Sequence, residues 1–183
     1  NRRLVVAAKK GMCITFNEQD ARCIGRTARG VKAITLGEGD CVAGLCVLDS
    51  EKKVLTISET GYGRRSDISN YRLQSRGGKG LINYHTKQYG DVAAITMVGE
   101  DEDVILIASD GILIRIPASD ISEFARPSKG VRVMRVSEGE KVVTVSVTEK
   151  SEEETDDAAE ASEAPQEAAA DAPAEETTAG EDA

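Results

Sequence analysis

Landmark residues return along this chain at a constant step of fifty positions. The glycines of the step are Gly11, Gly61 and Gly111, and its polar landmarks are Asp20, Asn70 and Asp120. A fixed period of about 20–50 residues is the sequence signature of a solenoid or propeller array. The repeat therefore predicts an array of similar units.

Each step contains short apolar runs separated by turn residues. Hairpin turns are predicted at Lys10-Gly11, Thr60-Gly61 and Asp110-Gly111, where an Asp-Gly or similar pair lies between two such runs. The further strand candidates are Gly30–Leu36 with Val42–Leu48, Leu81–Tyr84 with Val92–Val98, and Val131–Val136 with Val142–Val147. Alternating Val, Thr and Ser in the last of these has the period of a half-buried strand.

Four short strands in each step predict an all-β fold of propeller-like blades, each with four antiparallel strands. We expect two contiguous units, residues 26–71 and 76–121, to be complete. The units at either end should be partial and leave strand edges that a full disc would cover. Helical periodicity is absent from the body.

Charge divides the chain into two parts. Residues 1–150 carry all 23 Lys and Arg and 19 Asp and Glu, a net of +4, whereas residues 151–183 carry 13 acidic residues and no base. We expect residues 1–150 to be the folded domain and residues 151–183 to be a disordered acidic tail, because the tail has too little apolar surface to fold. A basic body with an acidic tail is typical of a protein that meets a polyanion. The tail either screens the body or only solubilises it.

Basic residues gather in the turns of the repeat. The turn Gln74–Gly80 has three glycines, Gly77, Gly78 and Gly80, whose amides can form an anion-binding concavity. The cations of this and the equivalent turns are Arg26, Arg29, Arg76, Lys79, Arg126, Lys129 and Arg132; those just past a hairpin glycine are Arg64, Arg65 and Arg115. Repeated on successive blades, they predict an exposed rim that contacts phosphates of double-stranded DNA without reading bases. The alternative is structural, with an Arg bonding a carbonyl of the next blade.

Other kinds of site find little support in the sequence. The four cysteines lack zinc-ligand spacing, and we interpret them as small buried residues in a reduced, cytosolic protein. Gln74–Gly80 lacks the spacing of a nucleotide-binding P-loop. We expect the tyrosines to pack, His85 to lie at the surface or the core edge, and no catalytic, metal or membrane-spanning segment to be found.

At this point the residues resemble a known family. Gln74–Gly80, the stretch Glu59–Ser66, the stretch Arg126–Val136 and the acidic tail are together similar to the C-terminal domain of the DNA gyrase A subunit. The resemblance implies a six-bladed β-pinwheel, about half of it present here, that wraps DNA so that the whole enzyme introduces negative supercoils. The chain opens at Asn1 within what reads as a repeat, so we expect it to be part of a longer protein.

The resemblance also implies partners, and this sequence departs from the family pattern at one position. It implies an A2B2 heterotetramer with the gyrase B subunit in the bacterial cytoplasm at the nucleoid, with ATP and Mg²⁺ bound by regions outside this chain. Ser75 stands where the family's signature box has a basic residue, so we interpret Gln74–Gly80 as a box-like element. Two alternatives remain open: the A subunit of topoisomerase IV, and a propeller-like protein-interaction module without DNA binding.

Overall fold

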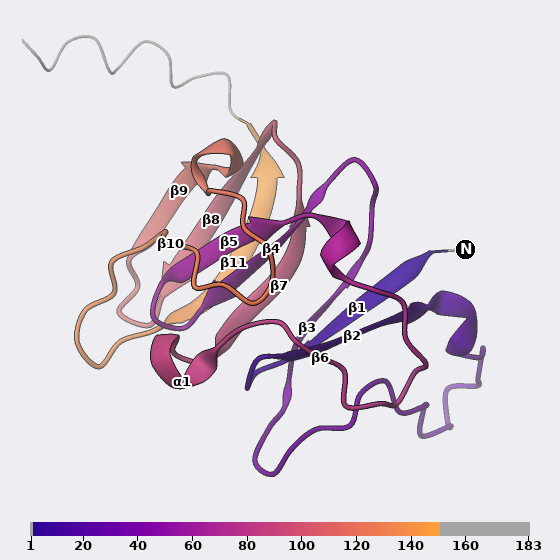
Figure 1. Cartoon of the computed structure of the whole chain (residues 1–183). Helices are drawn as coiled ribbons and strands as arrows, with labels where there is room; N and C mark the ends of the chain where they lie inside the picture. Colours follow the sequence, from indigo (N-terminus) through magenta and orange to yellow (C-terminus); the bar gives the residue numbers. More distant parts are fainter. Residues whose placement is uncertain (1, 151–183) are drawn as a thin grey trace, which may run out of the picture. The chain divides into compact units, whose positions relative to one another are not determined.

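A computed structural model describes residues 2–150 of the chain (Figure 1). The predictions about residues 151–183 therefore lie outside the described residues. The strands are β1 (Arg3–Ala8), β2 (Met12–Asn17), β3 (Val42–Val47), β4 (Lys53–Ser58), β5 (Tyr62–Ser66), β6 (Leu81–Ile82), β7 (Val92–Val98), β8 (Glu102–Ala108), β9 (Leu113–Pro117), β10 (Val131–Arg132) and β11 (Val142–Glu149). The short helices are η1 (Glu18–Asp20), η2 (Ile68–Asn70), α1 (Thr86–Tyr89) and η3 (Ala118–Asp120).

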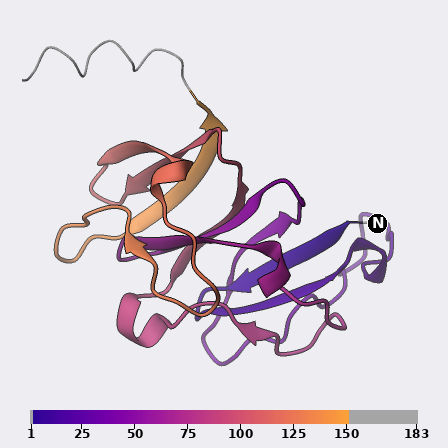
Figure 2. The same ribbon diagram turned by 45° about the horizontal axis from the view of Figure 1, so that its top comes forward.

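The strands form three antiparallel sheets within the described residues. Their orders are β3-β1-β2-β6, then β7-β4-β5-β10, and then β11-β8-β9; we refer to them as sheets A, B and C. The views in Figures 1 and 2 show each long hairpin as a separate blade. The predicted all-β, propeller-like class is confirmed.

The three predicted hairpins form with one shared turn geometry. Gly11, Gly61 and Gly111 have φ of 90°, 79° and 86°, a region that favours glycine. In each turn the glycine N–H donates to the carbonyl three residues earlier, at 3.0 Å. The fifty-residue step therefore repeats a backbone conformation.

The sheets are not built from contiguous units, which corrects the expected units 26–71 and 76–121. β3 pairs with β1, which precedes it in the chain, and β7 likewise pairs with β4. The fourth strands of sheets A and B come from the next repeat, because β6 pairs with β2 and β10 pairs with β5. Each of these two sheets is thus a hairpin, a strand about forty residues later, and a two-residue strand from the following repeat.

One expected strand does not form. Residues 30–36 have no strand conformation, although the equivalent stretches contain β6 and β10. The latter two strands exist because each meets the open edge of a hairpin, whereas residues 30–36 meet no such edge among the described residues. A short strand needs a partner for its backbone groups.

Sheet B packs between the other two sheets. Leu55 and Ile57 share a buried cluster with Leu106 of sheet C, whereas Val54 shares one with Val5 of sheet A. Alternate residues of β4 thus serve opposite faces, as the period of a strand requires. Because both faces of sheet B are covered, side chains of either face can be buried.

The cysteine interpretation is half right. Cys13 and Cys46 are buried, whereas Cys23 and Cys41 are exposed. Burial raises the pKa of Cys13 to about 11 and that of Cys46 to about 12. Cys23 and Cys41 lie in loops outside the strands, which leave them open to solvent.

Candidate nucleic-acid interface

The glycines of the basic turns allow a close approach between backbones. Gly80 has φ of 82°, and a Cβ added there would overlap the carbonyl oxygen of Cys13 in β2. Gly130, fifty residues on, has φ of 75° and would meet the carbonyl oxygen of Gly63 in β5 in the same way. These two glycines are needed for packing between repeats, whatever else the turn does.

Arg76 and Arg126 hold their turns against the preceding repeat. Nε of Arg76 donates to the carbonyl of Asp20 at 2.9 Å, and its Nη1 donates to the carbonyl of Lys32. Arg126 donates to the carbonyls of Asn70 and Ile82 at 2.8 and 2.6 Å. The acceptors differ by the same fifty positions as the donors. The structural alternative therefore describes these two guanidiniums, and their assignment to the DNA contact remains a prediction.

Arg64 is buried, contrary to the expected exposed rim. Its exposure is 0%, and its Nη2 donates to the backbone O of Asn83 at 2.6 Å and to Oδ1 of Asn83 at 3.1 Å. The guanidinium also lies over the ring of Tyr84, 5.6 Å from its centroid. Burial lowers the pKa of Arg64. The residues after β6 cover this face of β5, so Arg64 does not meet solvent.

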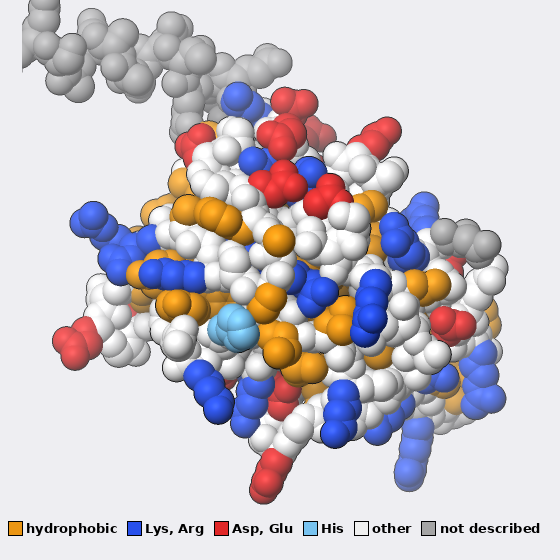
Figure 3. All heavy atoms as spheres, in the orientation of Figure 1, with side chains coloured by type: hydrophobic (Ala, Val, Ile, Leu, Met, Phe, Trp, Pro, Cys, Tyr) orange, Lys and Arg blue, Asp and Glu red, His pale blue; other side chains and the backbone are white. Residues whose placement is uncertain are grey.

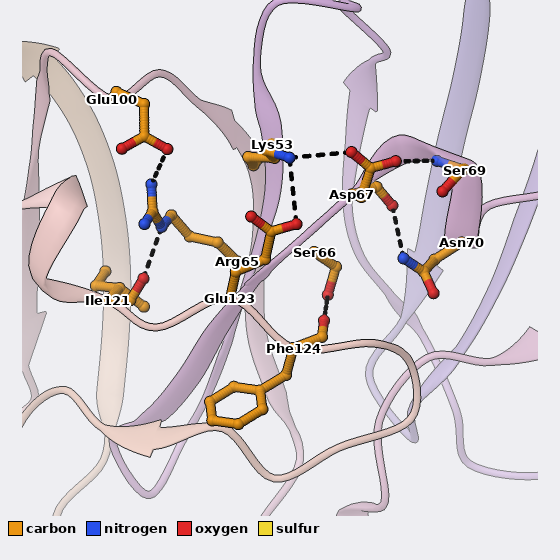
Figure 4. Close-up of polar contacts among 10 residues, drawn as sticks. All are labelled: Lys53, Arg65, Ser66, Asp67, Ser69, Asn70, Glu100, Ile121, Glu123 and Phe124. Atoms are coloured by element: carbon orange, nitrogen blue, oxygen red, sulfur yellow. Dashed lines mark hydrogen bonds and ion pairs between the residues drawn. The ribbon is translucent and has the colours of Figure 1, made fainter.

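Arg65 is also buried, and it lies on the opposite face of β5 because successive side chains of a strand alternate. Figure 4 shows its polar contacts. Its Nε donates to the carbonyl of Ile121 at 2.6 Å, and its Nη1 pairs with Glu100 at 2.7 Å. Ser66 next to it donates to the carbonyl of Phe124 at 2.7 Å. Residues 119–124 thus cover β5 here. The expectation that Arg64 and Arg65 lie on an exposed rim is wrong.

Arg115, the repeat equivalent of Arg65, is more accessible. Its Nε pairs with the buried carboxylate of Asp103 at 2.8 Å, and its Nη2 donates to the carbonyl of Glu149 at 2.9 Å. Its side chain is 32% exposed, compared with 8% for Arg65. Arg115 therefore joins neighbouring strands of sheet C while keeping part of its surface in solvent.

The remaining cations of the turns are accessible. Arg26, Arg29, Lys79 and Arg132 are exposed, and Lys129 is half-buried. Gly77 and Gly78 lie in the same turn as Lys79; Gly77 has φ of 85° and is half-buried, whereas Gly78 is exposed. The exposed cations can meet a phosphate without any rearrangement of the sheets.

Tyrosines fix the position of two of these cations. Nζ of Lys129 lies 4.3 Å from the ring centroid of Tyr62 and 5.2 Å from that of Tyr89. Arg132 donates to the hydroxyl of Tyr62 at 2.7 Å through Nη2. This hydrogen bond, more than the nearby charges, lowers the pKa of Tyr62. A cation held by aromatic contacts loses less rotamer entropy when it binds a phosphate.

Sequence reasoning missed a basic cleft beside these cations. Lys10, His85 and Lys87 line a shallow cleft of about 440 Å³. Lys87 lies in α1, and the equivalent positions of the other repeats are Gly37 and Ser137. At the next position Gln88 replaces the acids Glu38 and Glu138. The added lysine and the lost acid in this turn were the signal that could have found the cleft. In Figure 3 most Lys and Arg side chains lie in the middle and lower part of the face, and most acids on the face's upper part.

Residues 2–150 provide neither of two other kinds of site. No group of His, Cys, Asp and Glu in this part of the chain could hold a metal ion. None of its helices is long and apolar enough to cross a membrane.

Comparison with known proteins shows the family. Residues 2–45, 52–98 and 102–149 match the family described as "DNA gyrase C-terminal domain, beta-propeller". Each matched segment contains one hairpin and the long strand that follows or pairs with it, which is the repeat that the sheets show.

Curated relatives agree with that match. The DNA gyrase A subunit of Staphylococcus epidermidis (strain ATCC 12228) is 42% identical over 148 residues, which is 79% of this chain and 17% of that protein. The DNA gyrase A subunit of Haloquadratum walsbyi is 41% identical over 164 residues, 88% of this chain and 19% of that protein. The chain thus spans less than a fifth of the length of these relatives.

Solved structures share the fold. A DNA gyrase A C-terminal domain has a TM-score of 0.74 and 28% identity, over 80% of this chain and 50% of that one. The C-terminal domain of a DNA topoisomerase IV has a TM-score of 0.76 and 18% identity, over 81% of this chain and 47% of that one, and at this identity shows the fold alone. With the match of nearly all described residues, these findings place the chain in the family of DNA gyrase A C-terminal domains.

Proposed function

We propose that this chain binds and bends double-stranded DNA through the phosphate backbone, as a part of the C-terminal domain of a DNA gyrase A subunit. The observation that carries the proposal is the set of accessible cations in equivalent turns, Arg26, Arg29, Lys79, Lys129 and Arg132. Of these, Arg29, Lys79 and Lys129 stand at one position of the fifty-residue step, so equivalent charges lie in successive repeats. A curved row of cations favours a bent duplex and needs no base contacts.

The wider role follows from the relatives and is part of the same proposal. In the longer protein, the bent DNA would be presented to the remainder of the gyrase A subunit, and an A2B2 complex with the gyrase B subunit would introduce negative supercoils. ATP and Mg²⁺ would bind elsewhere in that complex, in the bacterial cytoplasm at the nucleoid. Relatives at 41–42% identity that are gyrase A subunits favour gyrase over topoisomerase IV.

The test removes two cations that the tyrosines hold. A chain with Lys129→Ala and Arg132→Ala should lose affinity for duplex DNA in a mobility-shift titration. Its plot of log affinity against log salt should flatten by about 0.9 for each phosphate that the variant no longer contacts. The loss should be equal for duplexes of unrelated sequence, because phosphates carry no sequence information.

The matched control removes the same charge elsewhere. Lys52 lies before β4, at the opposite end of that strand from the Gly61 turn, and Lys150 follows β11. Lys52→Ala with Lys150→Ala should change affinity and salt slope much less than the test pair. Equal losses of DNA affinity in the two double variants would mean that only the net charge of the chain matters, and not the position of the cations. No salt-dependent affinity in the unchanged chain would favour a protein-interaction module.

A further inference from the structure

The basic cleft lies where two successive repeats meet. Lys10, in the turn between β1 and β2, lies on one side, and residues of the segment 82–88 form the other side. The backbone holds the two sides together, because Gly11 O accepts from Asn83 N and Tyr84 N at 2.7 and 3.0 Å. Both repeats belong to the described residues, so the contact that shapes the cleft is fully described.

The three basic side chains of the cleft, Lys10, His85 and Lys87, are exposed, and none of them forms an ion pair within residues 2–150. Two acidic residues of the loop before β3 contact Lys10, but not through a charge pair. Nζ of Lys10 donates to the backbone carbonyl of Glu38 at 2.9 Å, and the backbone N of Lys10 donates to Oδ1 of Asp40 at 2.9 Å. No Asp or Glu is among the residues that line the cleft. An incoming anion therefore finds free donors and displaces no carboxylate.

The next repeat has a permanent cation at the position of His85. The equivalent residue is Arg135, which is also exposed. The residues before them, Tyr84 and Met134, are docked alike, because each donates its backbone N–H to a hairpin glycine, at 3.0 and 3.1 Å. His85 and Arg135 thus start from the same backbone position of two successive repeats. This position is positively charged at all times in one repeat and only on protonation in the other.

The charge of the cleft changes through its histidine. A histidine side chain changes its charge between pH 5 and 8, and the imidazolium form has two N–H donors. Tyr84, the one other titratable group of the lining besides the two lysines, is buried, and burial raises its pKa, so its hydroxyl stays neutral in that range. The cleft therefore gains one positive charge and one donor as the pH falls through the histidine range.

We infer that this cleft is a further phosphate site for double-stranded DNA, in which His85 binds as the imidazolium together with Lys10 and Lys87. The site presupposes the proposed function and adds three residues to the cations assigned there. Its position favours DNA over a free anion: the hydroxyl of Tyr84 donates to the carbonyl of Lys129 at 2.9 Å, so one side chain spans from the cleft to the turn that contains Lys129. A duplex that contacts Lys129 can thus place a neighbouring phosphate in the cleft. DNA affinity should then rise as the pH falls, because a bound phosphate favours the protonated histidine.

The first experiment measures the DNA affinity of the whole, untagged chain at two pH values, about pH 8 and about pH 6, on either side of the ordinary histidine titration. The ionic strength is held at about 0.1 M, where one phosphate contact is worth about eightfold in affinity. Because histidine is mostly protonated only at the lower pH, the affinity should rise about fivefold from the higher to the lower pH. The salt slope should steepen by up to about 0.9 over the same change.

Substitutions at two equivalent positions make this experiment specific. His85→Gln should bind DNA as the unchanged chain does at the higher pH, and its affinity should not rise at the lower pH. His85→Arg should bind at both pH values as tightly as the unchanged chain does at the lower one. Arg135→Gln is the matched control, because it removes a charge at the same position of the next repeat. The rise in affinity at the lower pH should persist in this control.

Proton NMR observes the same group directly, because the chain has one histidine. Duplex DNA should raise the midpoint of the imidazole titration by about 0.9 pH unit, the counterpart of an eightfold preference for the protonated form. Inorganic phosphate at the same total phosphate concentration should raise the midpoint much less. An equal rise with inorganic phosphate would overturn DNA as the ligand of the cleft.

The outcomes separate this site from the proposed function. DNA binding whose affinity does not rise at the lower pH would overturn the phosphate site and leave the proposed function standing. So would a rise that His85→Gln retains. A chain that binds DNA at neither pH would overturn both.

Discussion

Two pairs of cations lie on neighbouring strands of sheet B and have opposite environments. Arg64 and Arg65 lie in β5. Arg132 lies in β10 and Lys129 just before it, and β10 pairs with β5 at a spacing of about 4.8 Å. The first pair is buried and bonded to backbone carbonyls, whereas Arg132 is exposed and Lys129 half-buried. The difference comes from position in the sheet: β5 is covered on both faces by neighbouring repeats, and β10 is the edge.

Cations in this repeat protein therefore serve two purposes. A guanidinium that reaches the carbonyls of the adjacent repeat fixes the arrangement of the blades, which is the scaffold for any bent ligand. Under the proposed function, an accessible cation at an edge supplies positive charge to the DNA phosphates. We therefore expect substitution of a scaffold arginine to change stability, and substitution of an accessible cation to change DNA affinity alone.

The largest effect is expected for Arg64→Ala. The change leaves a cavity beside Tyr84 and removes the donor for two oxygen atoms of Asn83. We expect the free energy of unfolding to fall by about 3 kcal/mol or more. Urea unfolding followed by circular dichroism measures it, with Arg132→Ala as the control, expected within about 0.5 kcal/mol of the unchanged chain. Equal stabilities of Arg64→Ala and Arg132→Ala would show that the buried and the exposed cations of sheet B do not differ in their contribution to stability.

A smaller loss of stability is expected when the contact between two successive repeats loses its arginine. Arg126→Ala removes hydrogen bonds to the carbonyls of Asn70 and Ile82, worth about 1–3 kcal/mol for a charged donor. Arg126→Lys should recover little of this, because an ammonium cannot reach both carbonyls with the geometry of a guanidinium fork. The same urea titration tests both variants. Full recovery by lysine would show that charge alone matters at this position.

The repeat, the hairpins and the fold class could be predicted because each depends on local chemistry. The turn at Gly61 and the alternating apolar and polar residues of β11 can each be recognised from a few neighbouring residues of the sequence. The roles of Arg64 and Arg76 could not be predicted in this way. Whether an arginine contacts solvent or a backbone carbonyl depends on which repeat covers it. That depends in turn on which strands share a sheet, and the sequence alone does not show that β3 pairs with β1, a strand of the preceding hairpin. The basic cleft at Lys87 in α1 could have been predicted by comparing the equivalent turns of the three repeats.

Within the turn Gln74–Gly80, two cations three residues apart should behave in opposite ways. Arg76→Ala should lower the free energy of unfolding as Arg126→Ala does, because it removes the equivalent hydrogen bonds to the preceding repeat. Lys79→Ala should leave stability within about 0.5 kcal/mol and reduce the DNA salt slope by about 0.9 if Lys79 contacts one phosphate. Stability and salt slope measured on both variants decide the matter. A lower stability for Lys79→Ala would assign this lysine to the scaffold as well.

The smallest effect is expected for Tyr62→Phe, which keeps the ring under Lys129 and removes only the hydroxyl that Arg132 donates to. Arg132 then loses its fixed position, so DNA affinity should fall by about 0.5 kcal/mol, a little over twofold. The same substitution in an Arg132→Ala chain should change affinity no further, because the hydroxyl acts through Arg132. Spectrophotometric titration gives an independent check: in the Arg132→Ala chain the pKa of Tyr62 should rise back toward its ordinary value, since the hydrogen bond from Arg132 is the main cause of its lowering. An equal affinity loss in both backgrounds would mean that the hydroxyl contacts DNA itself.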